Sequence, residues 1–180
     1  MVSATARSSS SRALDAATTV RVDTLRVHAQ PVSLPLDITL FRQWLDAYRA
    51  DPAACSTGVW VDTEFAAAWF HDSSQRDLSE TFLAAPLTVM QLGEVAWVFH
   101  PSELYSYYGL AIRRDAPLPH TLVVGYADDI VGYLPDPTAY AAQEYSAITV
   151  PKILDLPPFD PTAAQVLATT SLDMLRRLVG

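Results

Sequence analysis

The stretch LTVMQLGEVAWVFHPSELYSYYGLAIRRDAPLPHTLVVGY, residues 87–126, decides the fold of this chain. It begins with two apolar runs, 87–92 and 95–99, which are separated only by Gly93-Glu94. Two short apolar runs joined by a glycine-containing pair are typical of a β-hairpin. The second run, EVAWVFH with its flanking residues, is almost entirely apolar. It therefore predicts a strand at the centre of a sheet.

The second half of this stretch predicts a helix and a further strand. Pro101 stops the hairpin, and Ser102 is expected to cap a helix that ends near Arg114. The run TLVVGY, 121–126, then predicts another buried strand. A strand, a helix and a strand in this order favour an α/β fold, or an α+β fold, in which a layered sheet carries flanking helices.

The flanking segments extend this pattern in both directions. A β-rich segment from Thr19 is expected to end at Pro31 and Pro35, and Asp37 is typical of a helix N-cap. An apolar face at helical spacing follows Asp37, and a similar stripe runs through the C-terminal segment. Helices are therefore expected over 38–51, 63–70, 138–142 and from about 160 to the C-terminus.

Composition restricts the function. Among 180 residues, 20 are acidic and 12 are basic, which gives a net charge of −8. Non-specific electrostatic binding to nucleic acid or to an anionic membrane is therefore not expected. The single cysteine, Cys55, excludes an internal disulfide, and no apolar run is long enough for a transmembrane segment. Residues 1–18, which include a run of serines, are expected to form a disordered tail.

The first candidate site residue is Glu103. It follows the predicted central strand, at a place where open α/β sheets position their ligands. A carboxylate there can ligate a metal or hold a substrate group, although an acid at a helix start is also a common cap. His100 either orients Glu103 or is simply the last residue of the strand.

The second candidate is the loop 125–135, GYADDIVGYLP. If the strands before Glu103 and before this loop are parallel neighbours, both segments leave the same edge of the sheet. Asp128 and Asp129 are its polar pair, and two tyrosines lie beside them. The alternative is an ordinary turn with solvated acids and tyrosines packed at its rim.

These segments, in this order, resemble the neutral/alkaline non-lysosomal ceramidase family. The resemblance rests on the run LTVMQLGEVAWVFHPSELYSYYGLAIRR, then HTLVVGYADDIVGYLPDPTAYAAQEY, then a terminal amphipathic helix. It is closest over residues 85–145 and looser back to 20 and on to 180. It implies that 19–180 form the C-terminal segment of a zinc-dependent catalytic domain.

The resemblance also implies roles for individual residues. The zinc ligands would be Glu103, in place of the Glu of a Pro-Gly-Glu motif, and Tyr133, the last Tyr of a Gly-x-x-Asn-x-Tyr-x-x-Tyr loop. Asp128 stands at the position of the Asn and would orient a ligand or a substrate hydroxyl. His100 and Tyr145 would lie beside the ligands or the substrate. The chain departs from the family pattern at three further positions, Ser102, Ile130 and Ser146.

The family's two histidine ligands and its active-site serine come from segments upstream, and those motifs are absent from this chain. The nitrogen ligands would therefore come from an upstream half of the same enzyme, with Zn²⁺ as cofactor.

The expected reaction is hydrolysis of the amide bond of ceramide or a related N-acyl lipid to a fatty acid and a sphingoid base, with this chain alone inactive. The alternative is a non-catalytic structural or interaction module that keeps the fold. The family is secreted or membrane-associated, but this chain shows no signal peptide.

Overall fold

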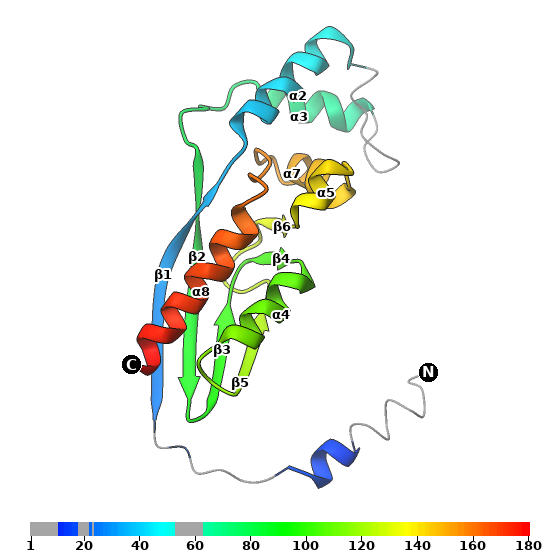
Figure 1. The fold of residues 1–180 in the computed structure, drawn as a ribbon. Coiled ribbons are helices and arrows are strands. Elements are labelled where there is room, and N and C mark those ends of the chain that lie inside the picture. The colour runs from blue at the N-terminus through cyan, green and yellow to red at the C-terminus, as the bar shows by residue number, and fades with distance from the viewer. Residues whose placement is uncertain (1–10, 18–21, 23, 53–62) are drawn as a thin grey trace.

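A computed structural model describes residues 11–17, 22, 24–52 and 63–180, so Cys55 and most of the predicted tail over 1–18 lie outside the described residues. A four-stranded sheet with the strand order β1-β2-β3-β5 forms the centre of the fold (Figure 1). The expected layered sheet with flanking helices is confirmed. The strands are β1 (Leu25–Pro35), β2 (Phe82–Leu92), β3 (Val95–Phe99) and β5 (His120–Val124).

The predicted hairpin is present, and the two strands that flank the predicted helix are parallel neighbours. β2 and β3 pair antiparallel around Gly93, whose φ of 59° suits the tight turn. β3 and β5 pair parallel, with helix α4 (Ser106–Asp115) between them in the sequence. The condition under which Glu103 and the loop 125–135 leave the same edge of the sheet is therefore met.

The prediction that Pro31 ends the first strand is wrong. β1 continues through Pro31 to Pro35, and Pro31 lies opposite Pro86 of β2. β1 is an edge strand, and Pro86 lies outside the part of β2 that pairs with β3. A proline lacks the N–H of the hydrogen-bond ladder, and such positions tolerate that loss.

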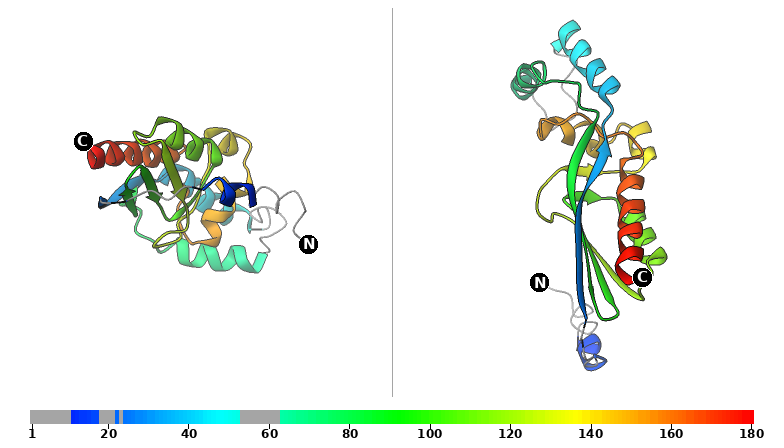
Figure 2. Two further views of the ribbon diagram at one scale, coloured as in Figure 1. Left: turned by 90° about the horizontal axis from the view of Figure 1, so that it is seen from below. Right: turned by 90° about the vertical axis from the view of Figure 1, so that its left-hand side faces the viewer.

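Helices α4 and α8 (Ala163–Val179) cover one face of the sheet, as both views in Figure 2 show. The stripe predicted for the C-terminal helix is confirmed, because Leu167, Met174 and Leu175 are fully buried. They pack in one core with the inward residues of β2 and β3, including Val89 and Val98. This core fixes the orientation of β3 and β5.

A second, two-stranded sheet forms where a helix start was expected. Ser102 does not cap a helix: it begins strand β4 (Ser102–Leu104), which pairs parallel with β6 (Gly132–Leu134). The backbone N–H of Tyr105 donates to the carbonyl of Leu134 at 3.2 Å, which extends this pairing to the start of α4. The helix therefore begins only at Ser106, and the expected loop 125–135 contains a strand.

Two further helices, α2 (Ile38–Ala50) and α3 (Thr63–Ser73), form a separate aromatic cluster beyond the end of the long β1–β2 pair (Figure 1). The predicted cap is confirmed, because the Asp37 carboxylate accepts from the N–H of Leu40 at 2.8 Å.

Lys152, the only lysine in the chain, is buried with its ammonium 4.6 Å from the ring centroid of Trp44. Lys152 lies on α7 (Val150–Ile153), which follows α5 (Pro137–Ala141) and α6 (Tyr145–Ile148). Within the described ranges, no helix has the length and apolar character needed to cross a bilayer.

Candidate functional site

The two predicted zinc ligands, Glu103 and Tyr133, lie side by side because two parallel strand pairs follow each other. β3 continues through His100 and Pro101 into β4, while β5 continues through the longer segment 125–131 into β6. Glu103 and Tyr133 are then register partners in the small sheet. Both lie beyond the carboxyl ends of β3 and β5, which is where open sheets of this kind hold ligands.

The Glu103 carboxylate is the centre of a small polar cluster. A hydrogen bond to this carboxylate raises the pKa of Tyr133 to about 12, and it also raises the pKa of Tyr126. The cause is direct: a phenol that donates to an anion resists losing its proton, since a phenolate would face the carboxylate. Both tyrosines therefore stay protonated at neutral pH and act as donors.

The segment between β5 and β6 holds Tyr126 in position at some conformational cost. Tyr126 and Asp128 adopt positive φ angles of 57° and 67°. Such a conformation costs an L-residue about 1–2 kcal/mol and persists where the surroundings enforce it. Backbone contacts with the β3–β4 connection do so, because the N–H of Ala127 donates to the carbonyl of His100 at 3.0 Å.

An open groove of about 880 Å³ leads to the cluster. Glu103, Tyr126 and Tyr133 lie at the polar part of its wall. The apolar part comes from α4 and from the free edge of β5 and includes Leu110, Leu122 and Val124. A groove with a carboxylate and two phenols next to an aliphatic wall suits a ligand that carries both a polar head and a hydrocarbon part.

His100 lies beneath this site and supports it. The imidazole is only 2% exposed, and this burial lowers its pKa to about 4, so that it is neutral at pH 7. Its Nδ1 lies 2.9 Å from Oγ of the fully buried Ser102. His100 thus contacts the backbone and side chain of Ser102, directly before Glu103.

Tyr105 forms another part of the groove wall. Its ring meets that of Tyr133 edge-on, with centroids 6.3 Å apart. Its hydroxyl donates to Oε2 of Glu144 at 2.8 Å and lies 2.7 Å from Oγ of Ser146. The position where the family pattern has a glutamate, Ser146, therefore helps to hold an aromatic wall.

The other predicted site residues lie farther out. Asp128 is exposed on the 125–131 segment and does not line the groove. Tyr145, at the start of α6, is 47% exposed, but lies near enough to contribute to the raised pKa of Tyr133. Ile130 is also exposed. Arg113 of α4 lines the groove, and no motif in the sequence pointed to it.

The donors at this site fit part of a zinc centre. A catalytic zinc takes about three protein ligands and keeps one position open. Glu103 and Tyr133 offer two adjacent oxygens, whereas Nδ1 of His100 is already held by Ser102. In the part of the chain that the structure describes, no group of three or more His, Cys, Asp or Glu side chains is placed to hold a metal ion. The two oxygens therefore fit as part of a ligand set that other residues must complete.

Comparison with models of known protein families gives no match, and neither does comparison with curated proteins. Two solved structures are similar. The neutral ceramidase from Pseudomonas aeruginosa shares 18% identity over 87% of this chain and 29% of its own, with a TM-score of 0.48. A ceramidase complexed with C2 shares 17% identity over 87% of this chain and 30% of its own, with a TM-score of 0.53. The second likeness shows that the fold of this chain is similar to part of a ceramidase fold.

The chain spans about 30% of the length of the ceramidase structures that it matches. The likeness covers 87% of this chain. At this level of identity it describes architecture only. Function has to be argued from Glu103, Tyr133 and the groove.

Proposed function

We propose that this chain is the C-terminal part of a zinc-dependent amide hydrolase that cleaves ceramide or a related N-acyl lipid. The observation that carries the proposal is the register pairing of Glu103 and Tyr133 at the polar end of a groove with an aliphatic wall. These are the two residues that the family resemblance selects from the sequence. The fold is similar to part of a ceramidase fold, which agrees with the architecture that the resemblance implies.

Glu103 and Tyr133 would hold the zinc ion together with nitrogen ligands from an upstream segment. When bound, zinc would polarise the amide carbonyl and lower the pKa of the attacking water. Tyr126 hydrogen-bonds to Glu103 and would keep its carboxylate oriented toward the ion. His100 and Ser102 would hold the backbone before Glu103 in place from beneath.

The chain's own groups also suit the substrate. Tyr133, held beside Glu103 in the small sheet, would lie next to the amide carbonyl oxygen on which charge develops. Leu110, Leu122 and Val124 give the hydrocarbon part of the lipid an apolar wall.

A non-catalytic module with the same fold is the second candidate. It is favoured by the chemistry of the described donors, because Glu103 and Tyr133 supply only oxygens to this site. Such a module would keep the groove as a binding surface without hydrolysis. The two candidates differ in whether zinc and ceramide cleavage appear when the missing ligands are supplied.

The test is to combine this chain with the polypeptide encoded directly upstream and to measure bound zinc and hydrolysis of a fluorescent ceramide. An amide hydrolase is expected to bind about one zinc per complex and to release fatty acid from ceramide faster than from an ester of similar chain length. A complex that binds no zinc and cleaves neither lipid would favour the non-catalytic module. Faster cleavage of the ester would support a hydrolase on this fold, but one that acts on esters rather than on ceramide.

A further inference from the structure

The face of the central sheet opposite α4 and α8 is apolar. Paired residues of neighbouring strands point to the same face, so the register identifies whole rows of side chains. One row joins Val27, Met90, Trp97 and Leu122 across all four strands. We call this row and the two beside it the open face; the other two rows are Leu25, Leu92, Val95, His120 and Ala29, Thr88, Phe99, Val124.

The open face is accessible, unlike the face under the helices. Val27 is 57% exposed and Leu122 is 48% exposed, whereas Val89 and Val98 on the covered face are fully buried. None of the residues in the three rows is Asp, Glu, Lys or Arg. An accessible apolar surface that extends across four strands is typical of an interface rather than of a surface exposed to water.

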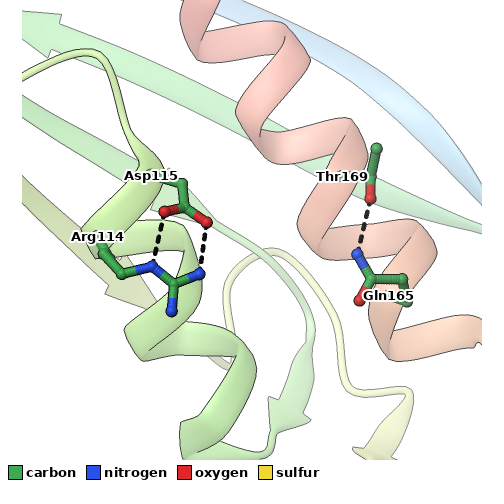
Figure 3. Close-up of polar contacts among 4 residues, drawn as sticks. All are labelled: Arg114, Asp115, Gln165 and Thr169. Atoms are coloured by element: carbon green, nitrogen blue, oxygen red, sulfur yellow. Dashed lines mark hydrogen bonds and ion pairs between the residues drawn. The ribbon is translucent and has the colours of Figure 1, made fainter.

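The outer surface of the helical layer shows the contrast (Figure 3). At the end of α4, Arg114 and Asp115 form an exposed ion pair at 2.7 Å. On α8, the side-chain amide of Gln165 donates to Oγ1 of Thr169 at 3.0 Å. These two polar pairs lie at exposed positions of the helical layer, whereas the three rows of the open face contain no Asp, Glu, Lys or Arg.

The open face is continuous with the candidate site. Among the described strands, β5 pairs with β3 alone, so its other edge is free. The groove runs along this edge, and Leu122 and Val124 belong both to the open face and to the groove wall. A layer that covered the open face and paired with β5 would therefore reach the groove that leads to Glu103.

We infer that the open face and the free edge of β5 dock a second polypeptide segment, the remainder of the ceramidase-like catalytic domain. This inference rests on the proposed function for the identity of the segment. The similar ceramidase structure leaves more than two thirds of its length unmatched by this chain, so enough polypeptide remains for another layer. A second copy of this chain is disfavoured, because each copy carries a net charge of −8.

The experiment co-expresses the full chain with the polypeptide encoded directly upstream and measures complex formation by light scattering and calorimetry. Val27→Glu and Leu122→Glu place charges on the open face at exposed positions where the fold has room for them. Each is expected to weaken the complex at least about tenfold, because a buried unpaired charge is costly. The matched control is Ile153→Glu on α7, which is also exposed and should bind like the wild type.

Several results would overturn the inference. One is that no polypeptide is encoded directly upstream. Another is that this chain is a monodisperse monomer that melts cooperatively and does not bind the upstream polypeptide. A third is that Val27→Glu and Leu122→Glu leave the complex intact. Self-association that these two variants abolish would assign the open face to a second copy instead. Glu103→Ala separates this inference from the proposed function, since it should leave docking unchanged. A complex that docks through the open face but cleaves no ceramide would uphold the interface and refute the reaction.

Discussion

Glu103 and Tyr133 face each other as register partners on the parallel strands β4 and β6. Their backbones are held by pairing between segments that lie far apart in the sequence, and the Glu103 carboxylate raises the pKa of the Tyr133 phenol. Two side chains fixed to neighbouring strands are more precisely placed than two side chains on a loop. The pair therefore behaves as one chemical unit, and changes at one residue should be measurable at the other.

Replacing Glu103 with Gln should lower the pKa of Tyr133 from about 12 toward 10, the ordinary value of a tyrosine. The neutral amide removes the anion that a phenolate would face. The measurement is a pH titration followed by NMR of ¹³C-labelled tyrosine rings, with Tyr133→Phe to assign the signal. Glu94→Gln, at the exposed hairpin turn, is the control and should leave the titration unchanged. A pKa of Tyr133 that stays near 12 in Glu103→Gln would show that the two side chains do not interact as described.

Replacing Gly125 with Ala should destabilise the protein by about 1–3 kcal/mol, the usual cost of overpacking. A Cβ at Gly125 would lie 2.7 Å from the carbonyl oxygen of Ser102, and that oxygen belongs to backbone that cannot rotate away. The strand that carries Glu103 would have to move. Urea denaturation gives the free energy of unfolding.

Gly109→Ala is the matched control for Gly125→Ala. Gly109 lies within α4, and a Cβ there would meet no atom within 4 Å. Alanine in a helix is expected to stabilise the protein by about 0.5–1 kcal/mol relative to glycine. Equal effects of the two substitutions would contradict the close approach of Gly125 to Ser102.

Acidification should weaken the fold through His100. Burial lowers its pKa to about 4 in the folded protein, from the ordinary histidine value of 6.5. The unfolded chain therefore binds more protons between these values, and the stability that His100 contributes is complete above about pH 6.5 and lost as the pH falls toward 4. The loss amounts to about 3 kcal/mol. His100→Asn should remove this part of the pH dependence, and an unchanged slope in that variant would rule His100 out as its source.

The local elements could be predicted from the sequence because their signals are local. Asp37 caps its helix three residues away, and Gly93 closes a turn between adjacent runs. The stripe of Leu167, Met174 and Leu175 follows helical periodicity within one segment. Each of these features depends on residues that are close to one another in the sequence.

The geometry around the site depends on pairing between distant segments, which periodicity does not reveal. Ser102 has the chemistry of a helix cap, yet the pairing of β4 with β6 draws it into a strand. For the same reason the hydrogen bond of Tyr126 to Glu103 had no signal in the sequence. Glu103 is a candidate from its place after the central strand and Tyr133 from its place in the loop 125–135, and the family resemblance then pairs them as zinc ligands. Their proximity then follows from the parallel order of β3 and β5.

The most direct test of the central claim is ceramide hydrolysis by the complex of this chain with the upstream polypeptide, measured for the wild type, Glu103→Ala and the control Glu94→Ala. If Glu103 and Tyr133 complete a zinc centre, Glu103→Ala should lower kcat/KM by about 100-fold or more, because even residues that only orient zinc ligands change activity by about 10–100-fold. Glu94→Ala should retain the wild-type rate. A Glu103→Ala complex that assembles and cleaves ceramide at the wild-type rate would contradict the account.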